Sequence, residues 1–185
     1  MSIRIESDKL ILRQFSPCDA KELHEICEEP YILKWMPDWK CSLEQRKELL
    51  AWFEKQYPLA TKQTARVMLA VTLKPAGNII GMVGIGNKKE VDNEIEIAYF
   101  ISRKHSGKGY ISQAAKMIVQ WAFSSLEMDY IIAIVETDNY PSQRVVEKCG
   151  FRKIDIRMIQ NCAETKEKPF FYYRLYNKNY SESVK

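Results

Sequence analysis

A short segment with two glycines and a lysine follows an apolar stretch near the middle of the chain. It consists of Ser106, Gly107, Lys108, Gly109, Tyr110 and Ile111. Phe100 and Ile101 close the apolar stretch, and a helical pattern begins near Gly109. Backbone N–H groups at the start of a helix lack partners within it and carry about half a unit of positive charge, so they bind phosphate groups. The segment therefore predicts a diphosphate site, because glycines let a ligand approach the backbone closely. An ordinary strand–helix turn is the alternative.

A second glycine-rich stretch, Gly81 to Gly86, predicts strand packing instead. No helical pattern follows it, whereas a dinucleotide-binding glycine motif opens a helix. The chain also lacks the G-x-x-x-x-G-K-[ST] sequence of a P-loop. The segment at 106–111 is therefore the candidate for phosphate binding.

Apolar spacing predicts the elements that must position this segment. In the first part of the chain we expect a strand within 4–15, a helix over 16–27 and a second helix over 42–58. The aromatic segment 31–39 has no clear period. We expect it to be a loop packed on the core, with a wall of the substrate site as the alternative.

The second part of the chain alternates strand and helix patterns. It predicts strands over 66–74, 79–86 and 94–102, a helix over 109–126, a strand over 130–136, a helix over 141–149, and strands over 151–159 and 170–176. A polar connection over 161–168 joins the two closing strands. The order β-α-α-β-β-β-α-β-α-β-β indicates an α/β protein with a mixed sheet covered by helices.

Composition excludes several classes of protein. The 185 residues suit one domain, since domains commonly hold about 150 residues. A net charge of +4 is too small for a dedicated nucleic-acid protein, so no direct nucleic-acid binding is expected. Five cysteines without a C-x-x-C pair and only two histidines predict no metal site. Without a secretory or membrane-spanning pattern, we expect a cytoplasmic protein that does not bind membranes.

Several spaced motifs together resemble one enzyme superfamily. After the strand predicted over 130–136 come Asn139, Ser142, Glu147, Lys148, Gly150 and Phe151. Before the glycine segment stand Glu96 and Tyr99, and Leu10 to Arg13 opens the pattern. These motifs, in this order, resemble the GCN5-related N-acetyltransferases (GNAT), and within them the branch that acetylates ribosomal-protein N-termini. The resemblance covers about residues 8–177.

The resemblance implies a fold and a cofactor. The fold is the GNAT acyl-CoA N-acyltransferase fold, a mixed sheet of about seven strands with helices on both faces. It forms one domain over 1–185, with a core of about 8–177. Acetyl-CoA is expected to bind segment 106–111 through its diphosphate and Phe100–Ile101 through pantetheine. Asn139 is expected to hold the pantetheine amides, and Ser142 to hydrogen-bond the leaving thiolate. A turn-forming role for Asn139 and a helix cap for Ser142 are the alternatives.

The implied reaction transfers acetyl to a primary amine, which must be neutral to attack, so a general base or water relay is needed. Glu96 is the candidate base. Glu94 lies on the same face of the predicted strand, and the alternative for both is a solvated or salt-bridged carboxylate. His105 is a less favoured candidate for the base, because it is expected to lie on the phosphate side of the segment. Val146 occupies the position of the tyrosine acid found in many members, so that route is closed.

The acceptor is the least specified part of the prediction. A protein N-terminus, such as that of a ribosomal protein, is expected. A small-molecule amine (an antibiotic, polyamine or amino acid) and a non-catalytic acyl-CoA-binding role are the alternatives. Ser106, Ile111 and Gln113 depart from the residues usual in this branch. We expect a monomer or a homodimer.

Overall fold

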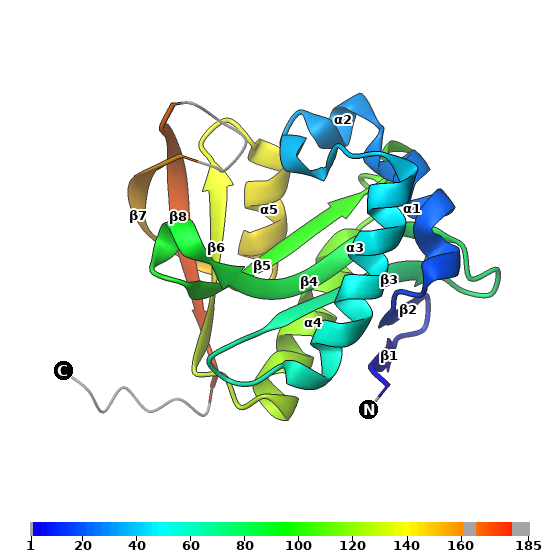
Figure 1. Ribbon diagram of the computed structural model, residues 1–185. Coiled ribbons are helices and arrows are strands. Elements are labelled where there is room, and N and C mark those ends of the chain that lie inside the picture. Colours follow the sequence, from blue (N-terminus) through cyan, green and yellow to red (C-terminus); the bar gives the residue numbers. More distant parts are fainter. Residues whose placement is uncertain (1, 161–165, 179–185) are drawn as a thin grey trace.

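The computed structural model describes residues 2–160 and 166–178 (Figure 1). Its strands are β1 (Arg4–Glu6), β2 (Leu10–Gln14), β3 (Arg66–Leu73), β4 (Ile79–Lys88), β5 (Glu94–Ile101), β6 (Tyr130–Glu136), β7 (Arg152–Ile159) and β8 (Lys168–Tyr176). Its α-helices are α1 (Ala20–Cys27), α2 (Pro30–Leu33), α3 (Leu43–Gln56), α4 (Tyr110–Ser125) and α5 (Tyr140–Lys148). Most of the polar connection predicted over 161–168 lies outside the described residues.

The described strands form one mixed sheet in the order β1-β2-β3-β4-β5-β6-β8-β7. Strands β5 and β6 run parallel, and the other neighbouring pairs are antiparallel. The α/β class and the mixed sheet predicted from the sequence are therefore confirmed. The sheet has eight strands rather than about seven.

The additional strand comes from the segment 4–15, which we expected to be a single strand. It is a hairpin in which β1 pairs antiparallel with β2. Ser7 makes the turn: its backbone N–H donates to the Leu10 carbonyl at 2.9 Å, and its Oγ accepts from the Leu10 N–H at 3.1 Å. A serine side chain that bonds to nearby backbone offers the chain an alternative to a continuous ladder.

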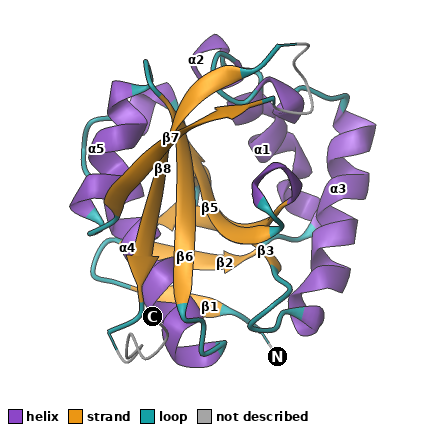
Figure 2. Ribbon diagram, turned by 90° about the vertical axis from the view of Figure 1, so that its left-hand side faces the viewer, coloured by secondary structure: helices purple, strands orange, loops and turns teal. Residues whose placement is uncertain are grey.

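Helices cover both faces of the sheet, as predicted (Figure 2). Helices α1 and α3 pack on one face, and α4 and α5 on the other. Along α4 the predicted apolar stripe is buried, with Ala115, Ile118 and Ala122 fully inaccessible to solvent. Of the helices in residues 2–160 and 166–178, none combines the length and the apolar character needed to cross a membrane.

The aromatic segment 31–39 is more ordered than the expected loop. It contains most of α2 and a 3-10 turn over Pro37–Trp39. Pro30 starts α2 at its first position, where the missing N–H has no helical partner to lose. The Glu29 carbonyl then accepts from the Ile32 N–H at 2.8 Å. Ile32 is buried, so the segment packs on the core as expected.

The parallel strands β5 and β6 separate toward their carboxyl ends. They are paired at Glu96 and Ile132, beyond which no further register between them is formed in the described sheet. Strand β5 continues along β4 to Ile101, and β6 continues along β8 to Glu136. In Figure 1 the two strands visibly diverge above this point. The sheet is therefore open where the predicted site residues lie.

The stretch 81–86 lies within β4, which confirms the predicted strand packing.

A Cβ at Gly84 would lie 2.3 Å from the Val67 carbonyl oxygen and 2.8 Å from the Met68 Cα. We expect Gly84→Ala to lower the free energy of unfolding in urea by about 1–3 kcal/mol, because backbone atoms must move. Gly86→Ala should lose less, since its Cβ meets only the Arg66 side chain. Equal losses would contradict this account.

Candidate active site

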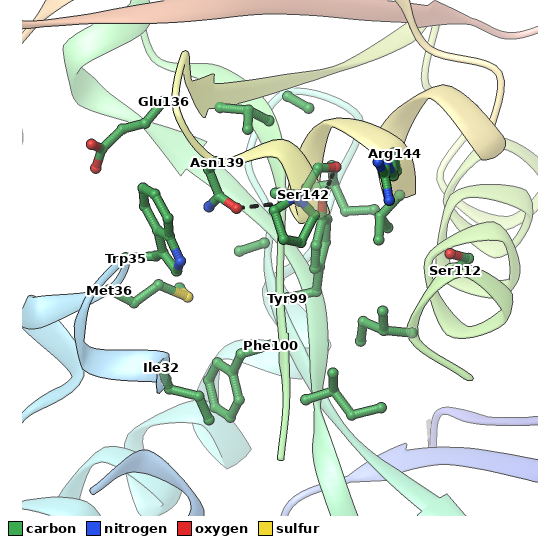
Figure 3. A pocket seen from close by; sticks show the side chains of 18 of the residues that line it. Ile32, Trp35, Met36, Tyr99, Phe100, Ser112, Glu136, Asn139, Ser142 and Arg144 are labelled. Atoms are coloured by element: carbon green, nitrogen blue, oxygen red, sulfur yellow. Dashed lines mark hydrogen bonds between the residues drawn. The ribbon is translucent and has the colours of Figure 1, made fainter. Parts of the chain in front are cut away.

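A cavity of about 460 Å³ opens between the separated ends of β5 and β6 (Figure 3). Its walls come from β5, β6, the start of α4, the start of α5 and the segment around α2. Of the predicted site residues, the following line it: Glu96, Phe100, Ile101, Ser106, Gly107, Gly109, Tyr110, Ile111, Asn139 and Ser142. Lys108 is the predicted residue that does not. The fold thus brings together side chains from segments more than 40 residues apart.

The glycine segment forms a tight turn into α4. Gly107 and Gly109 have φ angles of +76° and +82°, in the left-handed region that side chains disfavour. Gly109 is the N-cap of α4, which begins at Tyr110. In the described chain, none of the backbone N–H groups of residues 107–112 donates to a backbone carbonyl. The turn therefore presents several free backbone donors at the cavity, as an anion site requires.

At the start of α5, the helix cap is Asn139, whereas the sequence alternatives were a turn-forming Asn139 and a capping Ser142. Its Oδ1 accepts from the Ser142 N–H at 3.2 Å. Ser142 is therefore not the cap, and its hydroxyl engages Tyr99 instead. The Tyr99 Oη lies 2.7 Å from Ser142 Oγ and donates to the Ser142 carbonyl at 3.1 Å. Figure 3 shows the pair at the cavity wall.

Tyr99 is a site residue to which sequence reasoning assigned no role. Burial, which outweighs its hydrogen bond to Ser142, raises the pKa of the Tyr99 phenol, so the group is a hydrogen-bond donor throughout the neutral range. The partners are 43 residues apart in sequence. Tyr99 lies three residues after Glu96 on β5, so the alternation of a strand puts the two side chains on opposite faces. Only the fold brings α5 against the Tyr99 face.

Glu96 is half-buried at the point where β5 and β6 part. Burial raises the pKa of its carboxyl to about 7, against the lowering effects of Lys88 and of the Ile134 backbone N–H. A carboxyl with this pKa can both hold and release a proton near neutral pH. The cavity wall therefore carries a titratable group matched to proton transfer from an amine.

Glu94, two residues earlier on β5, is fully engaged elsewhere. It accepts hydrogen bonds from the Tyr172 hydroxyl at 2.8 and 3.0 Å and from Arg174 Nη2 at 2.9 Å. It does not line the cavity. The salt-bridged alternative therefore applies to Glu94. Of the two carboxylates, Glu96 lines the cavity and Glu94 does not.

His105 lines the cavity from the 3-10 turn that precedes the glycine segment. Burial lowers the pKa of its imidazole, and Lys108 and Lys104 lower it further. The imidazole is thus predominantly neutral near pH 7. That it lies on the phosphate side of the segment stays a prediction.

The segment around α2 forms the opposite wall of the cavity. Trp39 packs edge-on against Phe100, with ring centroids 4.9 Å apart. Glu29 accepts from the Arg103 backbone N–H at 2.7 Å, and the Arg103 guanidinium lies 4.9 Å from the Tyr31 ring. The segment therefore packs on the core, as expected, and also lines the cavity. That this wall contacts the substrate stays a prediction.

A second cavity of about 470 Å³ adjoins the first on the α3 side of the sheet. Both cavities are lined by Met36, Asp38, Lys88, Glu96 and Ala98. The second is otherwise walled by residues that sequence reasoning did not single out, among them Arg46, Trp52 and Arg66. Sequence reasoning assigned Arg46 no role; the signal that could have found it is its helical spacing with Leu50 and Phe53, which share its buried face of α3.

The separated parallel strands beside the glycine-rich start of α4 are typical of one class of protein, the acyl-CoA-dependent transferases. Residues 9–152 match the family model described as an acetyltransferase (GNAT) domain. The chain belongs to this family and is an N-acetyltransferase that uses acetyl-CoA as acetyl donor and an amine as acceptor. Among curated proteins it is similar to the uncharacterized N-acetyltransferase YoaA of Bacillus subtilis, with 27% identity over 80% of this chain and 82% of that protein.

Solved structures show the same fold. Ribosomal-protein-S5-alanine acetyltransferase from Vibrio fischeri superposes with a TM-score of 0.80 and 18% identity, covering 97% of this chain and 99% of that one. The microcin C7 self-immunity acetyltransferase MccE was solved in complex with acetyl-CoA and AMP. It superposes with a TM-score of 0.77 and 16% identity, covering 92% of this chain and 94% of that one. At these identities the likeness establishes the fold, and the predicted GNAT architecture is confirmed.

Proposed function

We propose that the enzyme acetylates a primary amine with Glu96 as the general base, on an acceptor that enters from the second cavity. The observation that carries this is the position of Glu96, which lines both cavities and has a pKa of about 7. An ammonium group at the shared wall would lie beside a carboxylate that can take its proton. The neutral amine could then attack the acetyl group held in the first cavity.

The first cavity fits acetyl-CoA in three places. The free backbone donors of residues 107–112 suit the diphosphate. Strand β5 near Phe100 and Ile101 has no partner strand on its β6 side, so its backbone is available to pantetheine amides. Asn139 uses its Oδ1 in the helix cap, which leaves its amide nitrogen to contact the ligand.

Ser142 is the proposed hydrogen-bond donor to the departing thiolate sulfur. The Tyr99 hydroxyl has one proton, which it can donate to the Ser142 carbonyl at 3.1 Å or to Ser142 Oγ at 2.7 Å. In the second arrangement, the Ser142 proton is free to point at the sulfur. Tyr99 then acts as a positioning residue. This arrangement replaces the tyrosine acid that Val146 excludes, because it supplies a polar donor from the same helix.

We expect Ser142→Ala to lower kcat by about 10- to 100-fold, since hydrogen bonds to charged groups are worth about 1.5–3 kcal/mol. The KM for acetyl-CoA should stay close to that of wild type. Steady-state kinetics with Ser124→Ala, an exposed serine of α4, provides the control. An unchanged kcat in Ser142→Ala, with chemistry rate-limiting, would remove Ser142 from the mechanism.

For the acceptor, a protein N-terminus such as that of a ribosomal protein is the first candidate. Its support is the resemblance to the ribosomal-protein branch, together with the fold shared with the S5-alanine acetyltransferase. A small-molecule amine is the second candidate, supported by the compact volume of the second cavity, about 470 Å³.

Release of free CoA thiol, measured with acetyl-CoA and panels of amines, tests the proposal. We expect turnover with at least one class, N-terminal ribosomal peptides or small amines, and mass spectrometry should identify the acetylated amino group. Tight acetyl-CoA binding without turnover on either panel would favour the non-catalytic alternative and contradict the proposal.

A further inference from the structure

The second cavity is lined by charges of both signs. Among the charged residues that line it, Asp38, Lys88 and Glu96 also line the first cavity. Arg46 and Arg66 line the second cavity alone, and both are cations. The remaining wall is largely aromatic and apolar, with Trp39, Leu49, Trp52, Phe53 and Met68. Two carboxylates and the Lys88 ammonium thus stand where the two cavities meet, and the second cavity adds two guanidinium groups.

Arg46 is a fully buried cation with unused donors. Its side chain on α3 has 0% exposure. Its Nη2 donates to the Trp39 carbonyl, and its guanidinium lies 5.3 Å from the Trp39 ring. Its Nε and Nη1 have no hydrogen-bond partner, and Arg46 forms no ion pair with the described residues. A buried charge with unpaired donors is costly, so binding of an anion at these donors would be favourable.

Arg66 brings a second guanidinium to the same cavity from β3. Its Nη2 donates to the Asn87 carbonyl at 3.0 Å. The side chain lies directly over Gly86, where an added Cβ would be 2.6 Å from Arg66 Nη1. The glycine therefore gives the guanidinium room to lie against the sheet at the cavity wall.

We infer that the acceptor carries an anionic group, a carboxylate or a phosphate, which binds Arg46 and Arg66 while its amine meets Glu96. The inference rests on the proposed function and names the acceptor's chemistry. The N–H donors of a guanidinium can form two parallel hydrogen bonds to either a carboxylate or a phosphate. Asp38 and Glu96 hold the ammonium end, so the two charges of the acceptor set its direction. The aromatic wall contacts the apolar part between them.

The test compares acceptors that differ only in the anion. The pairs are leucine and leucinamide, phosphoethanolamine and ethanolamine, and alanyl-glutamate amide and alanyl-glutamine amide. We expect kcat/KM to favour the anionic member of at least one pair by about 10- to 100-fold. Leucinamide has the less basic amine, so a preference for leucine cannot come from a larger neutral fraction. A preference within the first pair would indicate a small amino acid as acceptor, one within the second pair a phosphate ester, and one within the third pair the N-terminal end of a peptide.

Arg46→Met keeps the side-chain volume similar and removes the charge. We expect it to abolish the preference for the anionic member, and Arg66→Met to reduce the preference in the same direction. Lys47→Met, on the exposed side of α3, is the matched control. Because a buried unpaired cation costs stability, Arg46→Met should melt at or above the wild-type temperature. If Arg46→Met fails to fold, Arg66→Met still decides the question.

Calorimetry separates this inference from the proposed function. Titration of the anionic members into the enzyme with bound CoA should give binding that Arg46→Met weakens. If no amine is acetylated but this binding is present, the function is wrong and the anion site stands. Equal kcat/KM within every pair, or equal effects of Arg46→Met on both members, would overturn the anion site while leaving the acetyltransferase activity in place.

Discussion

Replacing Glu96 with glutamine is expected to lower kcat by about 10²- to 10⁴-fold, the usual loss when a general base is removed. The glutamine keeps the shape of the side chain and its place where β5 and β6 part, but cannot accept a proton. The affinity for acetyl-CoA, measured by calorimetry, should stay close to that of wild type. Because the variant no longer carries a charge at a buried position, its melting temperature should equal or exceed that of wild type.

Glu94→Gln is the matched control for this substitution, since Glu94 lies two residues away on the same face of β5. Its carboxylate is bound by Tyr172 and Arg174, so we expect lower stability but a kcat near wild type. A large loss of kcat in Glu94→Gln with little loss in Glu96→Gln would exchange the roles of the two residues. Wild-type kcat in both would favour a base that is neither carboxylate.

Gly109→Val is expected to weaken acetyl-CoA binding by about 10- to 100-fold, because a side chain at left-handed φ costs of order 1–3 kcal/mol. Gly109 has φ of +82° at the start of α4. Valine is branched at Cβ, so we expect the turn to change conformation and its backbone donors to leave the phosphate position. The dissociation constant from calorimetry measures this directly.

Gly77→Val separates lost binding from lost stability. Gly77 has φ of +76° in the turn between β3 and β4, away from the cavity, and its Cβ position is as open as that of Gly109. Both variants should therefore lose similar stability in urea, and only Gly109→Val should lose affinity. Equal affinity losses, or none in either variant, would rule out the glycine turn as the diphosphate site.

Local sequence patterns were sufficient to predict the elements around the first cavity. The apolar run over 130–136 coincides with β6, and the helical pattern over 109–126 matches α4 within a residue at each end. These elements are long and strongly periodic, so neighbouring residues determine them. The glycine segment was placed correctly at the start of α4 because its conformation depends on backbone freedom at Gly107 and Gly109.

Features that depend on contacts distant in sequence could not be predicted. The Tyr99–Ser142 pair joins β5 to α5, and no local pattern reports it. No role was predicted for Arg46, although its helical spacing places it on the same face of α3 as Leu50 and Phe53; its full burial depends on the packing of α3 against the sheet. The second cavity was not predicted for the same reason, since its walls come from segments that are far apart in the sequence.

The pH dependence of kcat/KM in wild type and Glu96→Gln tests the general-base assignment, the central claim, most directly. Glu96 must be ionised to accept a proton, so the wild-type kcat/KM should rise with pH through about 7, the pKa of its carboxyl. In Glu96→Gln that rise should be absent, leaving only the increase from the acceptor amine, so the two profiles converge at high pH. A wild-type profile without a group near this pKa, or the same group retained in Glu96→Gln, would contradict the account.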